Sequence, residues 1–214
     1  HKKVYGAGEV DFLHSEIINQ FFKQSDDRLK NNLTTKIQNV SLAYSNNLKH
    51  YKFDEPYVID KDPLNFMWIG FIKHIFPNSK IIHCNRNAND VCLSLYKNLF
   101  NGLNWSYSED EIAIFYNLYK DMMSFWHNKL PGFIYDIKYE SLVSNQKVEI
   151  QKIIDFCGLP IDQNCYDFHN NKTPIKTASV SQARKSVYAT SINLSDKYST
   201  KLENLFKQIK KNGP

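Results

Sequence analysis

The sequence predicts an α/β fold in which a parallel sheet is flanked by helices on both faces. Three short apolar segments, at residues 57–60, 80–84 and 133–139, are typical of buried strands. Helical patterns separate these segments, and strands that alternate with helices are typical of a parallel sheet covered on both sides. The chain has 214 residues, which suits one domain over residues 1–214.

Helical periodicity and end signals place the remaining elements. Ser25 or Asp26 can cap the second helix, Pro63 suits the first turn of the third, and Gly158 lies just past another helix end. Gly6 and Gly8 predict a tight loop ahead of the first helix. The predicted helices cover residues 10–24, 26–48, 64–76, 90–100, 109–129, 148–157 and 195–211.

Composition excludes several classes of protein. Hydrophobic residues make up 42% of the chain, which predicts a folded globule, and the net charge of +5 is too small to indicate nucleic acid. It fits a lysine-rich solvated surface or a basic patch around an anionic ligand. The longest apolar stretch, residues 66–75, is interrupted by Lys73 and His74, so we expect no membrane span. No signal peptide is visible, and we expect a cytoplasmic protein.

The four cysteines form no CxxC pair, which argues against a zinc knuckle or a thioredoxin-type site. Cys84, Cys92 and Cys157 lie among apolar residues and are expected to be buried thiols, although spacing alone leaves a disulfide open. His83 lies within a predicted strand and is expected to be a packed or supporting histidine. We predict no metal site.

Each predicted strand ends in polar residues that include a cation. These ends are Asp60-Lys61, Asn85-Arg86 and Lys138-Tyr139-Glu140. Ligands of such sheets bind beyond the carboxyl ends of the strands. The pattern therefore indicates an anionic ligand.

Arg86, Lys61 and Glu9 each have both a functional and a structural interpretation. Arg86, with Ser94 eight residues later, can clamp a phosphate, or it can simply pair with Asp90 on the surface. Lys61 can face the ligand or be an ordinary loop lysine. Glu9 can be a general base or a helix-end residue favoured by the helix dipole.

Four segments together resemble the PAPS-dependent sulfotransferases. These segments are GAGEVDFL, DKDPLNFMWIGFIKHIFPNSKIIHCNRNANDVCLSLY, IKYESL and IIDFCGLP, and residues 60–96 are the most specific stretch. The likeness is greatest to bacterial domains fused to tetratricopeptide repeats and to tyrosylprotein sulfotransferases. It implies a P-loop-NTPase-like sulfotransferase fold, PAPS as donor, PAP as product, no metal, and upstream tetratricopeptide repeats as a fusion partner.

The resemblance assigns roles to individual residues. Arg86 and Ser94 match residues that bind the donor 3′-phosphate, Tyr139 matches a tyrosine beside the nucleotide, and Lys61 matches a lysine near the scissile oxygen. Glu9 matches the catalytic base of the tyrosylprotein branch. Residues 177–191 resemble a loop that closes over the donor, with candidate contacts at Ser179, Ser181, Arg184, Lys185 and Ser186.

The sequence also departs from the family pattern. Ala88 occupies the position of a usual proline, which only sets the turn. The family begins with a strand and a Gly-Ser-Thr loop that cradles the 5′-phosphosulfate, and no equivalent occurs in these residues. We therefore expect a sulfotransferase fold that lacks its first strand and loop.

The resulting hypothesis is sulfuryl transfer from PAPS to a hydroxyl group. The acceptor is a tyrosine in an acidic peptide, a carbohydrate or a small alcohol. The alternative is a non-catalytic interaction domain that has kept the fold and lost donor binding. A nucleotide phosphotransferase is disfavoured because no Walker-type lysine motif is present.

Overall fold

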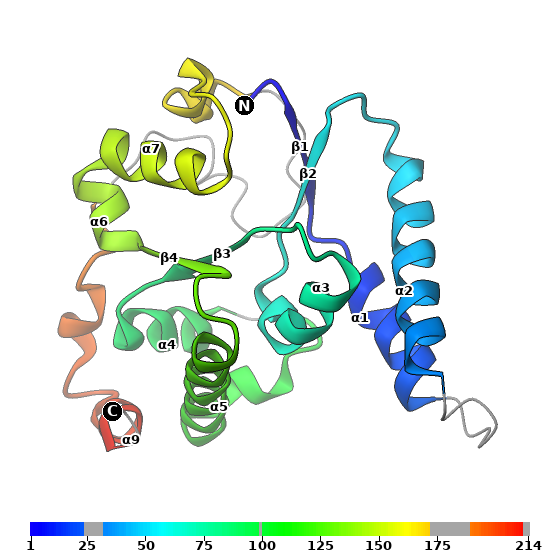
Figure 1. The fold of residues 1–214 in the computed structure, drawn as a ribbon. Coiled ribbons are helices and arrows are strands. Elements are labelled where there is room, and N and C mark those ends of the chain that lie inside the picture. Colours follow the sequence, from blue (N-terminus) through cyan, green and yellow to red (C-terminus); the bar gives the residue numbers. More distant parts are fainter. Residues whose placement is uncertain (24–31, 99, 172–188, 212–214) are drawn as a thin grey trace. The chain divides into compact units, whose positions relative to one another are not determined.

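The computed structural model describes residues 1–23, 32–98, 100–171 and 189–211 (Figure 1). The chain divides into two compact units. The first unit comprises residues 1–79 and 162–186, and the second comprises residues 80–161 and 187–214. Each unit holds one pair of parallel strands flanked by helices, which confirms the α/β class. The prediction of a single domain over the whole chain stays a prediction.

The first unit is built on strand β1 (Val4–Gly8), which pairs in parallel with β2 (Tyr57–Asp60). Its helices are α1 (Phe12–Ile17), which continues as a π-helical turn (Ile18–Phe22), α2 (Leu33–Leu48) and α3 (Ile69–Ile75). Its 3₁₀ turns are Lys49–Tyr51, Pro63–Trp68, Gln163–Cys165 and Phe168–Asn170. As expected, Pro63 lies in the first turn of its helical segment, and Asp62 caps that segment by accepting from the backbone N–H of Leu64 at 2.8 Å.

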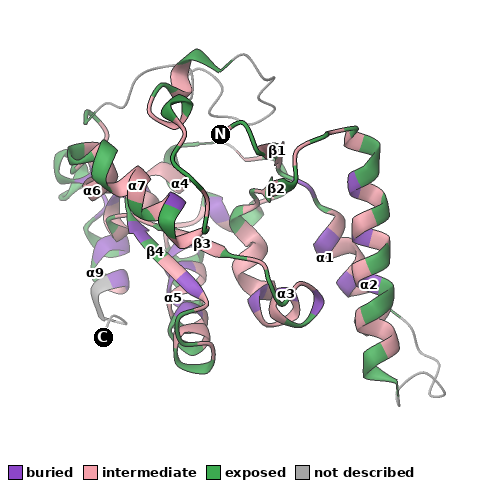
Figure 2. Cartoon of the chain, turned by 45° about the horizontal axis from the view of Figure 1, so that its top comes forward, coloured by how far each residue is buried: buried purple, intermediate pink, exposed green. Residues whose placement is uncertain are grey.

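Helix α2 buries one stripe of side chains in the first unit. Val40, Tyr44 and Leu48 recur at four-residue spacing and are all buried, so they lie on one face of the helix. Figure 2 shows this stripe along the side of α2 that faces α1. The hydroxyl of Tyr44 donates a 2.9 Å hydrogen bond to Asp60, which ties α2 to the carboxyl end of β2.

The second unit is built on strand β3 (Ile81–Asn85), which pairs in parallel with β4 (Ile134–Lys138). Its helices are α4 (Ala88–Lys97), α5 (Glu109–Lys129), α6 (Tyr139–Ser144), α7 (Gln146–Phe156) and α9 (Glu203–Lys211). Its 3₁₀ turns are Asn104–Tyr107 and Leu194–Tyr198. In Figure 1, α4 and α5 lie on one side of the strand pair and α7 on the other.

Helices α4, α5 and α9 enclose the core of the second unit. Cys92, Ile112 and Leu205, one from each helix, are fully buried in it. Around them pack Leu93, Ala113, Tyr116, Leu202, Phe206 and Ile209. Helix α5 begins at the residue predicted, because Ser108 accepts from the backbone N–H of Glu111 and three acidic residues occupy the first turn.

The structure corrects several sequence-based boundaries. The segment around Gly6 and Gly8 is strand β1 rather than a tight loop, so there are four described strands instead of three. The predicted 26–48 helix begins at Leu33, and residues 24–31 lie outside the described part. Helix α6 was not predicted, and the last predicted helix is a 3₁₀ turn followed by α9.

The four cysteines are free thiols. Cys92 is buried as expected and burial raises the pKa of its thiol to about 12, whereas Cys157 is half-buried and Cys84 is exposed. The expectation of a buried Cys84 was therefore wrong. Within the described ranges, no helix is both long and apolar enough to span a membrane.

Candidate active site

Glu9 and Lys61 meet at the carboxyl ends of the two strands of the first unit. Glu9 directly follows β1, Lys61 directly follows β2, and the last paired residues of the ladder are Gly8 and Asp60. The Lys61 ammonium donates a hydrogen bond to Oε1 of Glu9 and forms an ion pair with it. Parallel pairing therefore joins two residues that are 52 positions apart in the sequence.

Gly8 shapes the backbone at this point. Its φ of +79° lies in the left-handed region, and the strand register shifts between Gly6 and Gly8. The backbone N–H of Lys61 donates to the carbonyl of Gly8 at 2.8 Å, which extends the ladder one residue past β2. A Cβ atom at position 8 would meet no atom within 4 Å, so the cost of Gly8→Ala would come from the backbone conformation.

The Glu9–Lys61 pair is accessible to solvent. The Lys61 side chain is 53% exposed and the Glu9 side chain 45%. Exposed pairs of this kind contribute about 0–1 kcal/mol to stability. The two charges can therefore act on a bound molecule, and their removal should leave the fold intact.

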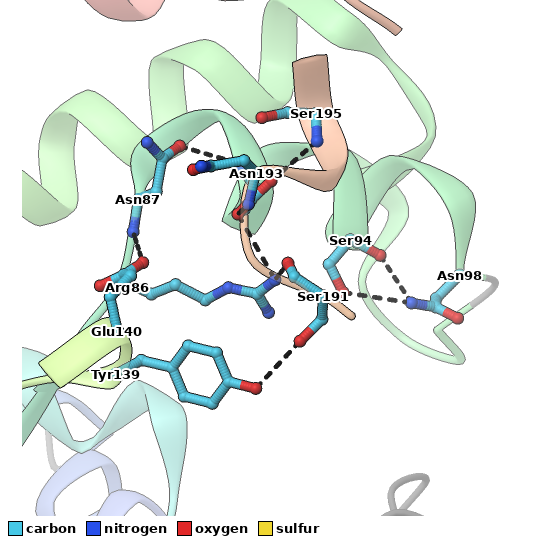
Figure 3. Close-up of polar contacts among 10 residues, drawn as sticks. Arg86, Asn87, Ser94, Asn98, Tyr139, Glu140, Ser191, Asn193 and Ser195 are labelled. Atoms are coloured by element: carbon cyan, nitrogen blue, oxygen red, sulfur yellow. Dashed lines mark hydrogen bonds and ion pairs between the residues drawn. The ribbon is translucent and has the colours of Figure 1, made fainter. Parts of the chain in front are cut away.

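Arg86 lies immediately after β3, where the second unit presents its strand ends (Figure 3). Its guanidinium donates to the backbone carbonyl of Ser191 and lies 3.7 Å from a carboxylate oxygen of Asp90. It also stacks over the ring of Tyr139, with 4.9 Å from Cζ to the ring centroid. The Nε–H of Arg86 is buried without a hydrogen-bond partner in the described structure.

Asp90 is a buried carboxylate that organises this corner. It is 2% exposed, and its two oxygens accept from the backbone N–H groups of Asn193 and Ser195, each at 2.8 Å. The sequence left open a surface pairing of Arg86 with Asp90. The pair exists, but Asp90 is buried and also holds residues 193–195 against helix α4.

Ser191 joins Arg86 and Tyr139 and was not singled out from the sequence. Its hydroxyl lies 2.9 Å from the hydroxyl of Tyr139, and its carbonyl accepts from Arg86 (Figure 3). It is the last residue of the segment 177–191 that resembles a donor-covering loop. Its place in that segment is the sequence feature from which Ser191 could have been identified as a site residue.

Glu140 and Ser94 make further hydrogen bonds around this corner (Figure 3). A Glu140 carboxylate oxygen accepts from the backbone N–H of Asn87 at 2.9 Å, which links α6 to the start of α4. The side-chain amide of Asn98 donates to the Ser94 hydroxyl at 3.4 Å and to the Ser94 backbone carbonyl at 2.6 Å.

The predicted site residues thus fall into two groups, one in each unit. The structure brings Glu9 and Lys61 together in the first unit. It brings Arg86 and Tyr139 together in the second unit, where Ser94 lies on α4. The other predicted donor contacts, Ser179, Ser181, Arg184, Lys185 and Ser186, lie outside the described residues.

Comparison with known proteins identifies the family. A model described as "Sulfotransferase family" matches residues 4–163, about three quarters of the chain. The chain belongs to the sulfotransferase family. The match covers Glu9, Lys61, Arg86 and Tyr139, whereas Ser191 lies beyond it.

Curated relatives of this sulfotransferase domain are longer proteins. An uncharacterized protein of Aquifex aeolicus is 29% identical over 213 residues, covering 90% of this chain and 27% of the relative. A putative protein-tyrosine sulfotransferase of Caenorhabditis elegans is 31% identical over 110 residues, covering 50% of this chain and 42% of the relative. The chain thus spans about a quarter to two fifths of the length of these relatives.

A solved structure shares the fold. The sulfotransferase domain from the curacin biosynthetic pathway superposes with a TM-score of 0.51 and 16% sequence identity. The superposition covers 98% of this chain and 82% of that domain. At this identity the likeness concerns the fold, and it confirms the predicted sulfotransferase-type arrangement of parallel strands and flanking helices.

Proposed function

We propose that this sulfotransferase domain moves a sulfuryl group from PAPS to a hydroxyl acceptor, with the side chain of a protein tyrosine as the preferred acceptor class. Family membership supports the reaction type. The name of the relatives from Caenorhabditis elegans and Caenorhabditis briggsae, putative protein-tyrosine sulfotransferase, supports the acceptor. A carbohydrate or a small alcohol is the alternative acceptor.

The observation that carries the donor assignment is the position of Arg86. It lies at the carboxyl end of β3, with its guanidinium over the Tyr139 ring and its Nε–H buried without a partner. Buried guanidinium donors of this kind suit a phosphate, because the planar guanidinium can donate two parallel N–H bonds to two phosphate oxygens. Arg86 and Ser94 would hold the 3′-phosphate of the donor, and Tyr139 would pack beside the nucleotide.

The Glu9–Lys61 pair supports the chemical step. The acceptor oxygen would attack sulfur as the bond between sulfur and the bridging oxygen breaks, and the acceptor proton would pass to Glu9. Because Lys61 engages Oε1 of Glu9, Oε2 is the oxygen that would receive this proton. The Lys61 ammonium would stabilise the negative charge that grows on the leaving PAP oxygen.

The alternative is a non-catalytic interaction domain that has lost donor binding. One observation favours it, since the Arg86 guanidinium is already engaged by Asp90 and by the Ser191 carbonyl. A donor phosphate would have to share or displace these contacts. A measurement of PAP binding therefore distinguishes a sulfotransferase from an interaction domain that has lost donor binding.

The test is a thermal unfolding titration of the full-length protein with PAP. At about 100 times the dissociation constant, a ligand adds about 2.7 kcal/mol of stability, which raises the melting temperature by several degrees. Arg86→Lys keeps a positive charge beside Asp90 but loses the two-pronged donor, so we expect PAP affinity to fall at least about tenfold.

The matched control is Lys147→Ala, which removes an exposed cation from α7 of the same unit and should leave PAP affinity unchanged. Absence of any PAP-dependent shift in the wild-type protein would contradict the donor assignment and favour the interaction domain. An equal loss of PAP affinity in both variants would show that the effect is not specific to the Arg86 side chain.

A further inference from the structure

His83, His127 and Asp136 form a cluster in the second unit that plays no part in the proposed sulfuryl transfer. His83 is on β3 and Asp136 is its register partner on β4, while His127 lies in the last turn of α5. Nδ1 of His83 lies 2.5 Å from one carboxylate oxygen of Asp136, and Nε2 of His127 lies 3.2 Å from the other. One ligand atom from each residue lies within 4.8 Å of the other two.

The three atoms suit a divalent transition metal. Zn²⁺ binds imidazole nitrogen and carboxylate oxygen at about 2.0–2.2 Å, so two ligands of a tetrahedral site lie about 3.3 Å apart. The two nitrogen–oxygen separations, 2.5 and 3.2 Å, lie below that value, and small side-chain rotations would lengthen the shorter one. Among the residues that the structure describes, this is the one group of three such side chains within ligand distance.

A fourth residue, Tyr119, holds the ring of His83 in place. The hydroxyl of Tyr119, on α5, is hydrogen-bonded to Nε2 of His83, the ring nitrogen that points away from Asp136. Metal-binding histidines typically have their second nitrogen held in this way, which fixes the ring and selects the coordinating atom. With a metal at Nδ1, the Nε2–H would donate to the Tyr119 oxygen.

The solvent exposure of the three side chains indicates a metal site that is open to solvent. The His83 side chain is 14% exposed, whereas those of His127 and Asp136 are 38% and 44% exposed. One ligand is thus anchored in the unit and two border solvent, which leaves access for an ion and for a water molecule. Three protein ligands plus an open position is the coordination of a zinc site that can hold an exchangeable ligand.

We propose that His83 Nδ1, His127 Nε2 and the Asp136 carboxylate form a zinc-binding site that joins β3, β4 and α5. The ligands are nitrogen and oxygen, which suit Zn²⁺ and exclude a thiolate-type knuckle. The ion replaces the hydrogen bond between Asp136 and His83 and the ion-pair contact between Asp136 and His127, and it bridges three elements of one unit. The site is additional to the donor and acceptor residues, so its test does not depend on sulfotransferase activity.

The test uses the full-length protein, free of any polyhistidine tag and stripped of metal with a chelator. Zn²⁺ is titrated in competition with a chromophoric chelator, and Co²⁺ serves as a spectroscopic probe, since its visible bands report four-coordinate nitrogen and oxygen ligation. We expect one equivalent to bind and the melting temperature to rise with Zn²⁺.

Three variants test the ligands His127 and Asp136 and the outer partner Tyr119. Loss of an outer partner typically lowers metal affinity about 10- to 100-fold, so we expect Tyr119→Phe to lower Zn²⁺ affinity by that factor. His127→Ala removes a ligand and should lower Zn²⁺ affinity further. Asp136→Asn, similar in shape, should also lose most of the affinity and keeps the fold testable if His127→Ala unfolds. His74→Ala, at an exposed histidine of α3, is the matched control and should bind Zn²⁺ as the wild type does.

Two outcomes would overturn the proposal. One is a wild-type protein that takes up no Zn²⁺ at micromolar concentration. The other is equal Zn²⁺ affinity in His127→Ala, Asp136→Asn and His74→Ala. In either case the three side chains would form a hydrogen-bonded network only.

Discussion

The hydroxyl of Tyr139 lies 2.9 Å from the hydroxyl of Ser191, although 52 residues separate them in the sequence. Ser191 also accepts from Arg86 through its carbonyl, so one residue contacts both aromatic and cationic members of the corner. The end of the segment that resembles a donor-covering loop is therefore held at the carboxyl ends of β3 and β4. A donor bound by Arg86 would lie beside this attachment.

The first prediction concerns the energetic coupling of Tyr139 and Ser191. Tyr139→Phe and Ser191→Ala each remove one hydroxyl of the pair, and each should lower the free energy of unfolding by about 0.5–1.5 kcal/mol. The ring of Tyr139 and the carbonyl of Ser191 remain, so the contacts to Arg86 are kept. Urea unfolding of both single variants and the double variant measures the coupling.

Because the two hydroxyls share one hydrogen bond, the double variant should cost little more than either single variant. Fully additive losses would show that the hydroxyls do not interact. Tyr198→Phe, which removes a hydroxyl from a 40% exposed tyrosine of the same unit, is the control and should change stability little.

Several site residues could be predicted from the sequence because they lie directly after strands. Arg86 and Tyr139 each directly follow a short apolar strand, and Glu9 and Lys61 do the same in the first unit. Parallel strands bring such residues to one edge of their sheet. The pairing of Glu9 with Lys61 also depends on β1, which the sequence did not predict. Helix α5 was equally predictable, because Ser108 caps it and acidic residues fill its first turn.

Other features depend on contacts between distant segments. Strand β1 was missed because Gly6 and Gly8 disfavour a strand locally, and pairing with β2 overrides that preference. The burial of Asp90 could not be predicted because its partners, the N–H groups of Asn193 and Ser195, lie more than a hundred residues away. The His83–Asp136 contact likewise requires the register of β3 and β4.

The second prediction concerns Asp90. Its carboxylate accepts from two backbone N–H groups and lies beside the Arg86 guanidinium while almost fully buried. Asp90→Ala would leave these donors without an acceptor, and we expect it to lower the free energy of unfolding by about 3–5 kcal/mol. Urea unfolding monitored by circular dichroism measures the loss.

The control for this prediction is Asp121→Ala, at an exposed position of α5, which should change stability by less than about 0.5 kcal/mol. Asp90→Asn keeps one oxygen acceptor, so its loss of unfolding free energy should lie between those of Asp90→Ala and Asp121→Ala. A loss below about 1 kcal/mol in Asp90→Ala would mean that the described contacts contribute little to holding residues 193–195.

The third prediction separates catalysis from binding at Glu9. Glu9→Gln keeps the shape of the side chain and removes its basicity, so turnover should fall about 100- to 10,000-fold while PAP affinity stays unchanged. The exposed ion pair with Lys61 contributes little stability, so the melting temperature should also stay within a few degrees. Sulfuryl transfer from labelled PAPS to a tyrosine peptide, alongside PAP titration, gives both quantities.

Glu16→Gln, on helix α1 of the same unit, is the matched control and should retain turnover. Lys61→Met should also lower turnover, by about 100-fold or more, because charge on the leaving oxygen loses its counter-ion. Normal turnover in Glu9→Gln would exclude Glu9 as the base, and lost PAP binding in the same variant would place it in donor recognition.

The fourth prediction concerns the pH dependence of stability through Asp60. Burial raises the pKa of the Asp60 carboxyl, and this effect outweighs the opposing hydrogen bond from Tyr44. In the unfolded chain the group returns to its ordinary pKa of about 3.9. The folded protein therefore binds more protons in the interval between the two pKa values, and this contribution to stability is present at low pH and lost as the pH rises through that interval.

Asp60→Asn removes this titration and keeps an oxygen that can accept from Tyr44. We expect the free energy of unfolding of the variant, relative to that of the wild type, to rise as the pH increases from about 4 towards neutrality. Urea unfolding at several pH values measures the difference, and Asp54→Asn, at an exposed position of the same unit, is the control. If the Asp60→Asn difference shrinks with rising pH, the carboxylate is stabilised by its surroundings and its pKa lies below the ordinary value.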